Sequence, residues 1–233
     1  LVTWLPMDGH FANFGDIGGA AKIPPSTARF SPSPLTGTYW KGDTATSSAE
    51  ITAGFTPAAL GVSGAALRTM FFEGCIVGAG ATFHTLFSYG ATGTATRFNI
   101  SVRGNLIDIN CGGGGGNVSL VITNGAQTTN AEFFRAVIRY DGTNVLLDVY
   151  SFDPATRVWT STSTTLAITL ATSTTALALY YSSVVSTVDG TSGLSYLGIV
   201  GGYSWSDAEV DAFLLDPSAL WSPRPARARY VDI

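Results

Sequence analysis

FFRAVIRYDGTNVLLDVYSF, residues 133–152, is the stretch around which the rest of the chain is organised. Apolar residues recur at every second position in both of its halves, which is the side-chain period of a half-buried β-strand. Between the halves stands Asp141-Gly142-Thr143-Asn144, a strong turn signal because Gly, Asn and Asp tolerate a positive φ. The stretch therefore predicts a β-hairpin.

The pairing of the two strands stays open between two registers. A loop of two residues would pair Ile138 with Val145, and a loop of four would pair it with Leu147; both keep apolar residues opposite each other. Arg135 and Arg139 prefer water, so we expect their face of the hairpin to be solvated and the other face to enter the core. An isolated hairpin is marginal in water, and the rest of the chain must therefore supply a second layer. The expected core-facing residues of the first strand are Phe134, Ala136, Ile138 and Tyr140.

Composition narrows the class of protein. The chain has 233 residues, of which 45% are hydrophobic, enough for one sizeable core. Charged residues make up only 12%, about half of the usual share, and the net charge of −4 argues against nucleic acid or an anionic membrane surface as the main partner. No apolar run reaches the roughly 18 residues of a membrane span. Cys75 and Cys111 do not make a disulfide framework, and we expect both to be buried free thiols.

Most other segments predict short strands. The run of residues 66–77 is apolar almost throughout and predicts a strand buried on both faces. Prolines in residues 23–37 indicate irregular extended chain on the surface. The glycine run of residues 112–116 lacks the helix pattern and the Lys-Ser/Thr of a phosphate-binding loop, so we expect a floppy hairpin loop there. The other expected strands are residues 1–7, 38–42, 49–55, 82–89, 96–102, 106–110, 118–123, 156–162, 164–172, 175–183 and 196–201.

One segment predicts a helix. Ser206 and Glu209 have the spacing of a capping box, and an Asp-Pro dipeptide would end the helix after residue 215. The apolar residues that share one helical face are Val210, Phe213 and Leu214. We therefore expect an all-β fold with one short C-terminal helix, in a single domain of residues 1–221 followed by an extended tail of residues 222–233.

The order of the motifs resembles a known superfamily. It begins with a strand and a turn at Asp8-Gly9, continues with LFSYG at residues 86–90 and with a Phe-x-Ile-x-Val strand and Gly-Asn turn at residues 98–105, and reaches the central hairpin. It closes with YSWSDAE, residues 203–209, and DPSALW, residues 216–221. This order resembles the laminin-G-like, concanavalin A-like lectin/glucanase superfamily, and the closing segment is similar to that of bacteriophage virion proteins of this superfamily. The resemblance implies a jelly-roll sandwich of two antiparallel sheets, a fold that serves lectins, glycosidases and adhesion modules.

The sequence does not show the carboxylate spacing of a glycosidase. Retaining glycosidases of this superfamily place two carboxylates about 5 Å apart on one sheet face. None of the glutamates has an acidic neighbour two or four residues away on an expected strand. His84 lies in the middle of an expected strand, where a hydrogen-bonded structural role is favoured over a Ser-His-Asp site. We therefore expect that the protein is not an enzyme.

No cofactor and no metal is expected. The histidines and cysteines do not form a zinc-binding spacing. Oxygen-rich loops at residues 8–16 and at Asp189 leave calcium open as an alternative, because many lectin-like sandwiches bind calcium at loop ends. No fixed ligand spacing supports that alternative.

Two groups of residues are candidate binding sites. An exposed aromatic ring can stack on the apolar face of a sugar, and packing into the core is the alternative for each ring. The tail is kept extended by its prolines, and its arginines suit carboxylates on a neighbouring subunit, with a solvated chain end as the alternative. The candidate glycan-binding residues are Tyr39, Trp40, Trp159, Tyr180 and Tyr181. The candidate partner-binding residues are Arg224, Arg227, Arg229 and Tyr230.

These observations predict a non-enzymatic, lectin-like virion protein that acts as a capsid decoration or as a tail or fibre adhesion module. Its expected partners are other virion subunits, in a homo-oligomer or attached to a lattice, and glycans of the host or the environment. A secreted bacterial or extracellular carbohydrate-binding module is the first alternative. A glycoside hydrolase is the second.

Overall fold

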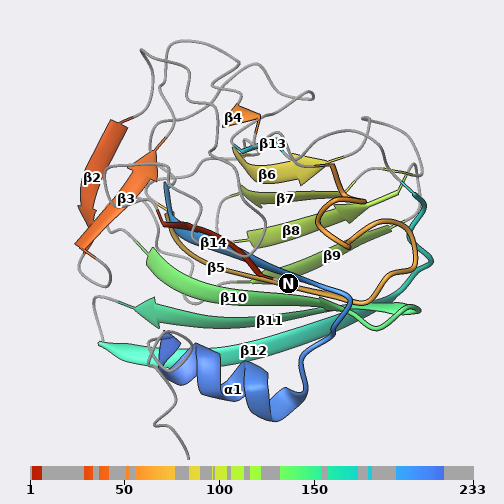
Figure 1. Cartoon of the computed structure of the whole chain (residues 1–233). Helices are drawn as coiled ribbons and strands as arrows, with labels where there is room; N and C mark the ends of the chain where they lie inside the picture. The colour runs from red at the N-terminus through yellow and green to blue at the C-terminus, as the bar shows by residue number, and fades with distance from the viewer. Residues whose placement is uncertain are drawn as a thin grey trace, which may run out of the picture.

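Two antiparallel β-sheets form a sandwich, and one short helix lies against the outer face of the larger sheet (Figure 1). The structure, a computed structural model, describes residues 2–6, 29–33, 37–41, 51–52, 56–76, 84–89, 96, 98–103, 106–112, 116–121, 132–153, 157–172, 178–179 and 193–217. In these residues strand greatly exceeds helix. The chain is an all-β sandwich of the jelly-roll type with one short C-terminal helix, as the sequence predicts.

The larger sheet contains β1 (Val2–Pro6), β2 (Arg29–Ser33), β3 (Gly37–Lys41), β5 (Arg68–Ile76), β10 (Glu132–Tyr140), β11 (Asn144–Asp153), β12 (Val158–Ala167) and β14 (Gly193–Gly201). Its strand order is β12-β11-β10-β5-β14-β3-β2, and β1 pairs with β14 beside this path. The smaller sheet contains β4 (Ile51–Thr52), β6 (His84–Tyr89), β7 (Phe98–Arg103), β8 (Leu106–Cys111), β9 (Gly116–Val121) and β13 (Ala178–Leu179). Its strand order is β4-β13-β6-β7-β8-β9. The helix, α1, spans Asp207–Leu215.

The predicted central hairpin is formed by β10 and β11. Ile138 pairs with Leu147, which selects the register with the four-residue loop. On its other side β10 pairs with β5, whose residues 68–74 are buried on both faces, as the sequence predicts. The hairpin therefore lies inside the larger sheet, and β12 beyond it forms the end of the strand path.

Asp141 organises the loop of this hairpin. Its Oδ1 accepts hydrogen bonds from the backbone N–H groups of Thr143 at 2.8 Å and Asn144 at 2.6 Å, and Gly142 supplies the positive φ of 98°. The side-chain amide of Asn144 donates to Oδ2 at 2.9 Å. Desolvation acts to raise the pKa of Asp141, but the hydrogen bonds from Asn144 and Thr143 together lower this pKa from 3.8 to about 2.

We expect the substitution Asp141→Asn to reduce the loss of stability in acid. A carboxylate with a depressed folded-state pKa stabilises the fold above its unfolded pKa of about 3.9, and this contribution is lost as the pH falls through the folded pKa of about 2. Because Asp141 is exposed, solvent screening limits the effect to about 1 kcal/mol. Urea unfolding of both proteins at about pH 6, 4 and 2 measures it. The difference in unfolding free energy should shrink between pH 4 and pH 2, and a constant difference would contradict the prediction.

The core between the sheets is apolar from both sides. Phe72 of β5 and Phe134 of β10 meet edge to face, with ring centroids 5.8 Å apart and ring planes at 89°. The face of β10 expected to enter the core is buried. The smaller sheet contributes the buried side chains of Phe98, Ile100, Ile107, Ile109 and Cys111. Full burial of a large apolar side chain contributes about 1.5–3 kcal/mol, which makes this layer the main source of stability.

Cys111 is a buried free thiol, as predicted. Burial raises its pKa to about 12, against the opposing effect of the Arg68 charge. The side chain of Cys75 lies outside the part of the chain whose side chains are described. The free thiol expected at Cys75 stays a prediction.

The prediction that the arginine face of β10 is solvated is wrong. α1 and the segment before it cover this face and build a second apolar cluster on it. Arg139 is only 7% exposed as a result. The pattern of a single strand shows where charges stand, but it does not show that a distant helix will supply partners for them. The buried members of the cluster are Phe71, Val137, Val200, Trp205, Val210, Phe213 and Leu214.

Two other expectations are corrected. Residues 29–33, inside the segment expected to be irregular, form β2; Pro32 is tolerated there because β2 ends the strand path of the sheet. The two expected threonine-rich strands are one strand, β12, because it pairs residue for residue with β11 from Val158 to Ala167. The strands on either side of the glycine run, β8 and β9, pair antiparallel, with Cys111 opposite Gly116.

No helix among the described residues is long and apolar enough to cross a membrane. The expected tail, residues 222–233, lies outside the described residues, as does the expected domain boundary at residue 221. The division into a domain and a tail stays a prediction. The same holds for the structural role expected of His84, whose side chain is not described.

Candidate functional site

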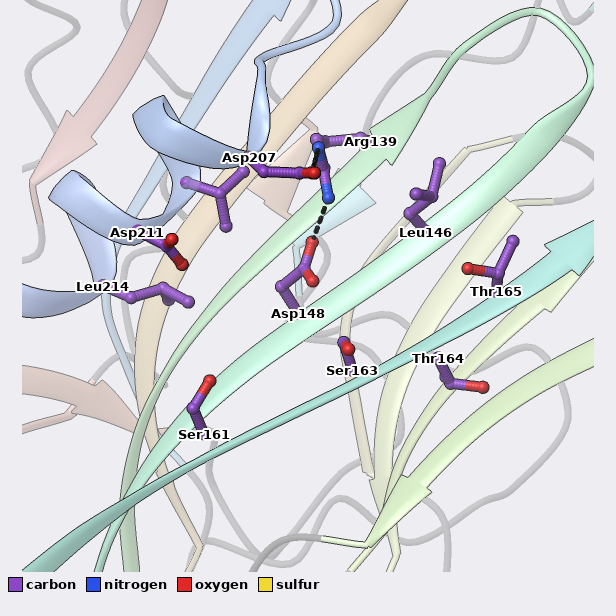
Figure 2. A pocket seen from close by; sticks show the side chains of 11 residues that line it. Arg139, Leu146, Asp148, Ser161, Ser163, Thr164, Thr165, Asp207, Asp211 and Leu214 are labelled. Atoms are coloured by element: carbon purple, nitrogen blue, oxygen red, sulfur yellow. Dashed lines mark hydrogen bonds and ion pairs between the residues drawn. The ribbon is translucent and has the colours of Figure 1, made fainter.

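A groove of about 330 Å³ lies on the outer face of the larger sheet, between α1 and the strands β11 and β12. Figure 2 shows carboxylates from the helix on one side of it, hydroxyl groups from β12 on the other, and Arg139 with Asp148 between them. The charged side chains and two of the hydroxyl groups that line it belong to Arg139, Asp148, Ser161, Ser163, Asp207 and Asp211.

The helix wall of the groove is held by aromatic packing. The ring of Trp205 stacks on Phe71 of β5, with centroids 5.0 Å apart and planes at 18°. Phe213 packs against both rings, at 5.1 Å from Phe71 and 5.7 Å from Trp205. The backbone N–H of Trp205 donates to the Thr69 hydroxyl at 2.9 Å, which satisfies a buried donor just before the helix begins.

The predicted capping box sets the start of α1. The backbone N–H of Glu209 donates to Ser206 Oγ at 3.4 Å, and the backbone N–H of Ser206 donates to Glu209 Oε2 at 2.7 Å. Val210, Phe213 and Leu214 are buried, as the helical pattern predicts. Capping and apolar patterning therefore decide which helical face turns towards the sheet and which face is left to line the groove.

Arg139 ties the helix to the sheet inside the groove. One terminal nitrogen, Nη1, donates to Asp207 Oδ1 at 2.6 Å and to the carbonyl of Trp205 at 3.1 Å. The other, Nη2, donates to Asp148 Oδ2 at 2.9 Å. Burial alone would lower the pKa of Arg139, but its contacts with Asp207 and Asp148 raise that pKa above its ordinary value.

The carboxylates around Arg139 outnumber the positive charge between them. Burial raises the pKa of Asp148, the charge and hydrogen bond of Arg139 lower it, and the nearby charges of Asp207 and Asp211 raise it again; the balance is a pKa above the ordinary value. Asp207 is largely exposed although it is paired with Arg139. Asp211 is exposed one helical turn further on and has no ion pair or hydrogen bond within the described residues. The groove is therefore an electronegative surface with at least one uncommitted carboxylate.

Arg135 fixes the far end of the helix. Its Nε donates to the buried Glu73 at 3.2 Å, and Nη1 donates to the carbonyls of Leu214 at 2.9 Å and Leu215 at 3.2 Å. A cation at the last carbonyls of a helix is favoured by the helix dipole, by about 0.3–1 kcal/mol or more when partly buried. The two arginines that the sequence placed in water thus anchor the two ends of α1.

The opposite wall is a row of hydroxyl groups on β12. Ser161 and Ser163 occupy alternate positions of the strand and share its outer face with Trp159. The register places Ser163 opposite Asp148 and Ser161 opposite Tyr150 on β11. Both serines are exposed, so their hydroxyls are available to a ligand.

An aromatic group closes one end of this row. Trp159 stacks on Tyr150 with centroids 4.6 Å apart and planes at 15°, and it contacts Phe152 at 5.1 Å. The Arg135 guanidinium lies 5.0 Å from the centroid of the Trp159 ring. These contacts leave Trp159 half-buried. Its ring is partly packed against its neighbours and partly exposed at the surface.

Of the predicted glycan-binding residues, only Trp159 falls where side chains are described. Tyr39 and Trp40 lie in β3, and Trp40 pairs with Leu194 of β14, but their side chains are not described. The remaining predicted residues lie outside the described residues: Tyr180, Tyr181, Arg224, Arg227, Arg229 and Tyr230. All of these assignments stay predictions.

Sequence reasoning missed the polar residues of the groove. Two signals could have found them. Residues 159–165, WTSTSTT, put a tryptophan and small hydroxyl residues at alternate positions, which is one face of a strand. Asp207 and Asp211 are four residues apart and therefore neighbours on one helical face. Nothing local in the sequence shows that this face and this strand lie together.

We expect a chelator to leave the melting temperature unchanged. Within the described residues, no group of three or more His, Cys, Asp or Glu side chains could hold a metal ion. A calcium site filled at 100 times its dissociation constant would contribute about 2.7 kcal/mol, a shift of several degrees for a chain of this size. Thermal unfolding with and without EDTA measures it, and a clear drop would point to a calcium-dependent lectin.

The comparisons with known proteins show the fold. No family model matches the chain, and no curated protein matches it. The binding domain of botulinum neurotoxin DC, solved in complex with SialylT, is similar at 8% identity and a TM-score of 0.61, over 92% of this chain and 50% of that one. The botulinum neurotoxin serotype D/C binding domain is similar at 10% identity and a TM-score of 0.62, over 91% and 51%. A structure of botulinum neurotoxin type C, whose cell entry depends on interaction with two ganglioside molecules, is similar at 8% identity and a TM-score of 0.57, over 92% and 50%.

The chain thus spans about half the length of these solved structures. At such low identity the likeness is one of fold. It agrees with the β-sandwich expected from the sequence.

Proposed function

We propose that this protein is a non-enzymatic, lectin-like module that binds glycans in the groove between α1 and β12. The observation that carries the proposal is the composition of the groove: serine hydroxyls and carboxylates face each other across it. The half-buried ring of Trp159 follows on the same face of β12, two residues before Ser161, and stacks on Tyr150. Sugars present hydroxyl groups around an apolar ring face, so they are recognised by a few placed polar groups beside an aromatic side chain.

Each wall has a distinct role in this proposal. Carboxylates such as Asp211 accept hydrogen bonds from sugar hydroxyls, and Ser161 and Ser163 donate or accept as their hydroxyls rotate. The exposed part of Trp159 offers an apolar surface at the end of the row. Glu73 of β5 is fully buried and bound to Arg135, and Asp148 of β11 is bound to Arg139, so neither is a free carboxylate for glycoside hydrolysis. This supports binding without catalysis.

The solved neighbours support the same class of function. The neurotoxin DC and D/C neighbours are binding domains, and botulinum neurotoxin type C depends on interaction with two ganglioside molecules for cell entry. The shared fold supports a binding function for this chain, but the fold alone does not decide the function, which rests on the groove.

A glycan array with blocked variants tests the proposal. Ser163→Tyr places a large side chain in the groove, and Thr162→Tyr places the same side chain at the neighbouring exposed position on the other face of β12. We expect the parent and Thr162→Tyr to give the same array signals and Ser163→Tyr to lose them. A blank array for the parent protein, or equal signals for all three proteins, would refute glycan binding at this groove.

We further propose that the module belongs to a bacteriophage virion, on the capsid or on the tail. The support is the order of sequence motifs and the closing segment, YSWSDAE and DPSALW, which resemble phage virion proteins of the concanavalin A-like superfamily. Mass spectrometry of purified virions tests it. Finding the chain only in culture supernatant would favour the alternative, a secreted carbohydrate-binding module.

Deletion of residues 222–233 tests the proposed role of the tail. We expect the truncated protein to fold like the parent but to assemble with virion subunits or attach to virions less well, because the deleted arginines would pair with carboxylates on the neighbouring subunit. High salt should partly mimic the deletion, since the screening length falls from about 10 Å at 0.1 M to about 3 Å at 1 M. Equal attachment of both proteins would leave the tail as a solvated chain end.

A further inference from the structure

The charge of the groove carries an inference about which glycans it takes. Three aspartates and one arginine line it. The arginine does not offset the carboxylates for an incoming anion, because Arg139 is 7% exposed and both of its terminal nitrogens are bound to Asp148 and Asp207. An anionic sugar would therefore meet the uncommitted Asp211 without a free cation to receive it.

Two further features indicate what the groove lacks. Among the described residues, the buried Nε–H donor of Arg139 has no hydrogen-bond partner, although the side chain lines the groove. An acceptor oxygen brought in by an occupant would offset that unmet hydrogen bond. The three carboxylates also exceed the single positive charge of Arg139. The pKa of Asp148 is raised first by burial, and the charges of Asp207 and Asp211 add to that rise. A hydroxyl oxygen of an occupant would accept a hydrogen bond from Arg139 Nε–H. A positive charge on the same occupant would offset the excess of carboxylates in the groove.

We propose, on the basis of the glycan-binding function above, that the groove selects amino sugars whose amine is free and protonated, over neutral and anionic sugars. An ammonium group has three donors and no acceptor, so it suits Asp211 and the outer oxygens of Asp148 and Asp207. The sugar hydroxyls beside it reach the serines of β12. The preference is opposite in charge to the gangliosides named for one of the fold neighbours, and it follows from this chain's own aspartates.

Three trisaccharide-sized probes separate the possibilities. They are glucosamine trisaccharide, the N-acetylated form of the same trisaccharide, and sialyllactose, measured by calorimetry at about pH 6, below the range of about 7.7–8 in which an α-amino group titrates. We expect the free-amine form to bind about tenfold tighter than the acetylated form, since a charge-assisted hydrogen bond is worth about that factor. Sialyllactose should bind most weakly.

A pair of variants separates recognition in the groove from general attraction to an acidic protein. Asp211→Asn should bring the free-amine and acetylated forms to within about twofold of each other. Asp216→Asn removes the same charge from an exposed position at the end of the same helix, outside the groove, and should leave the tenfold preference unchanged.

The outcomes are distinct. Tight binding of the acetylated form or of sialyllactose by the parent protein would overturn the charge selectivity and leave glycan binding standing. A preference that falls equally in both variants would overturn the assignment to the groove. Failure of the free-amine form to bind overturns the inference. A blank array, or equal array signals for the parent, Ser163→Tyr and Thr162→Tyr, overturns the proposed function as well.

Discussion

Phe213→Ala is expected to lower the free energy of unfolding by about 3–5 kcal/mol, the range for removal of a buried phenylalanine ring. Phe213 is 1% exposed, and its ring contacts both Phe71 and Trp205. The cluster lies on the outer face of the sheet, where α1 and the segment before it cover it, and little can collapse into the space that the ring leaves. Urea denaturation measures the change through a shift of the midpoint at constant slope.

Leu215→Ala is the matched control for this prediction. Leu215 lies on the same helix and is 67% exposed, so its substitution should change stability by about 0.5 kcal/mol or less. Its backbone carbonyl, which accepts from Arg135, is unaffected by the change. If Phe213→Ala costs no more than Leu215→Ala, the aromatic cluster does not hold the helix. Because α1 forms one wall of the groove, Phe213→Ala should also lower the affinity for any ligand bound there.

Gly201→Ala is expected to cost about 3 kcal/mol, the upper end of the range for an overpacked site. A Cβ at Gly201 would collide with the carbonyl oxygen of Leu60 and approach Gly61 Cα to 3.0 Å. Both of these are backbone atoms, which cannot move aside as the end of a flexible side chain can. The residue pairs with Arg68 at the end of β14, so a shift there disturbs the pairing of β14 with β5.

Gly202→Ala is the comparison for this prediction, because it introduces backbone strain without a steric collision. Gly202 has φ of 76°, and a Cβ there would meet nothing within 4 Å. Only the left-handed backbone conformation opposes alanine, at a cost of about 1 kcal/mol. The melting temperature should therefore fall by about 6–12 °C for Gly201→Ala and by about 2–4 °C for Gly202→Ala, as measured by thermal unfolding. The reverse order would show that the loop before β5 yields to the added methyl group.

Local patterns predicted the elements where neighbouring residues decide the outcome. The alternation of residues 133–152 and the turn at Asp141 predicted the hairpin, and the Ser206 and Glu209 spacing predicted the helix and its start. These signals depend on backbone periodicity and on hydrogen bonds between residues a few positions apart. The same patterns did not separate the two registers of the hairpin, since both pair apolar residues, and they divided β12 in two because serine and threonine also suit turns.

The candidate site depended on contacts that no local pattern contains. Arg139, Asp148 and Asp207 come together only because β10 pairs with β11 and because α1 then covers the outer face of both. For that reason the arginines of β10 were assigned to water, whereas the structure uses them to anchor the helix. Trp159 was predicted as a binding residue from its residue type, but its half-buried position depends on Tyr150 across the strand pair.

The sequence by itself determined the all-β class, the central hairpin, the buried strand before it and the single capped helix, because each follows from side-chain period and short-range hydrogen bonding. Only the tertiary structure decided that α1 docks on the arginine face of β10 and that a groove with an excess of carboxylates opens beside β12. The physical reason is that burial of Phe71, Trp205 and Phe213 against each other supplies the free energy for docking. Phe71 stands far along the chain from Trp205 and Phe213, so their contact is a property of the folded molecule.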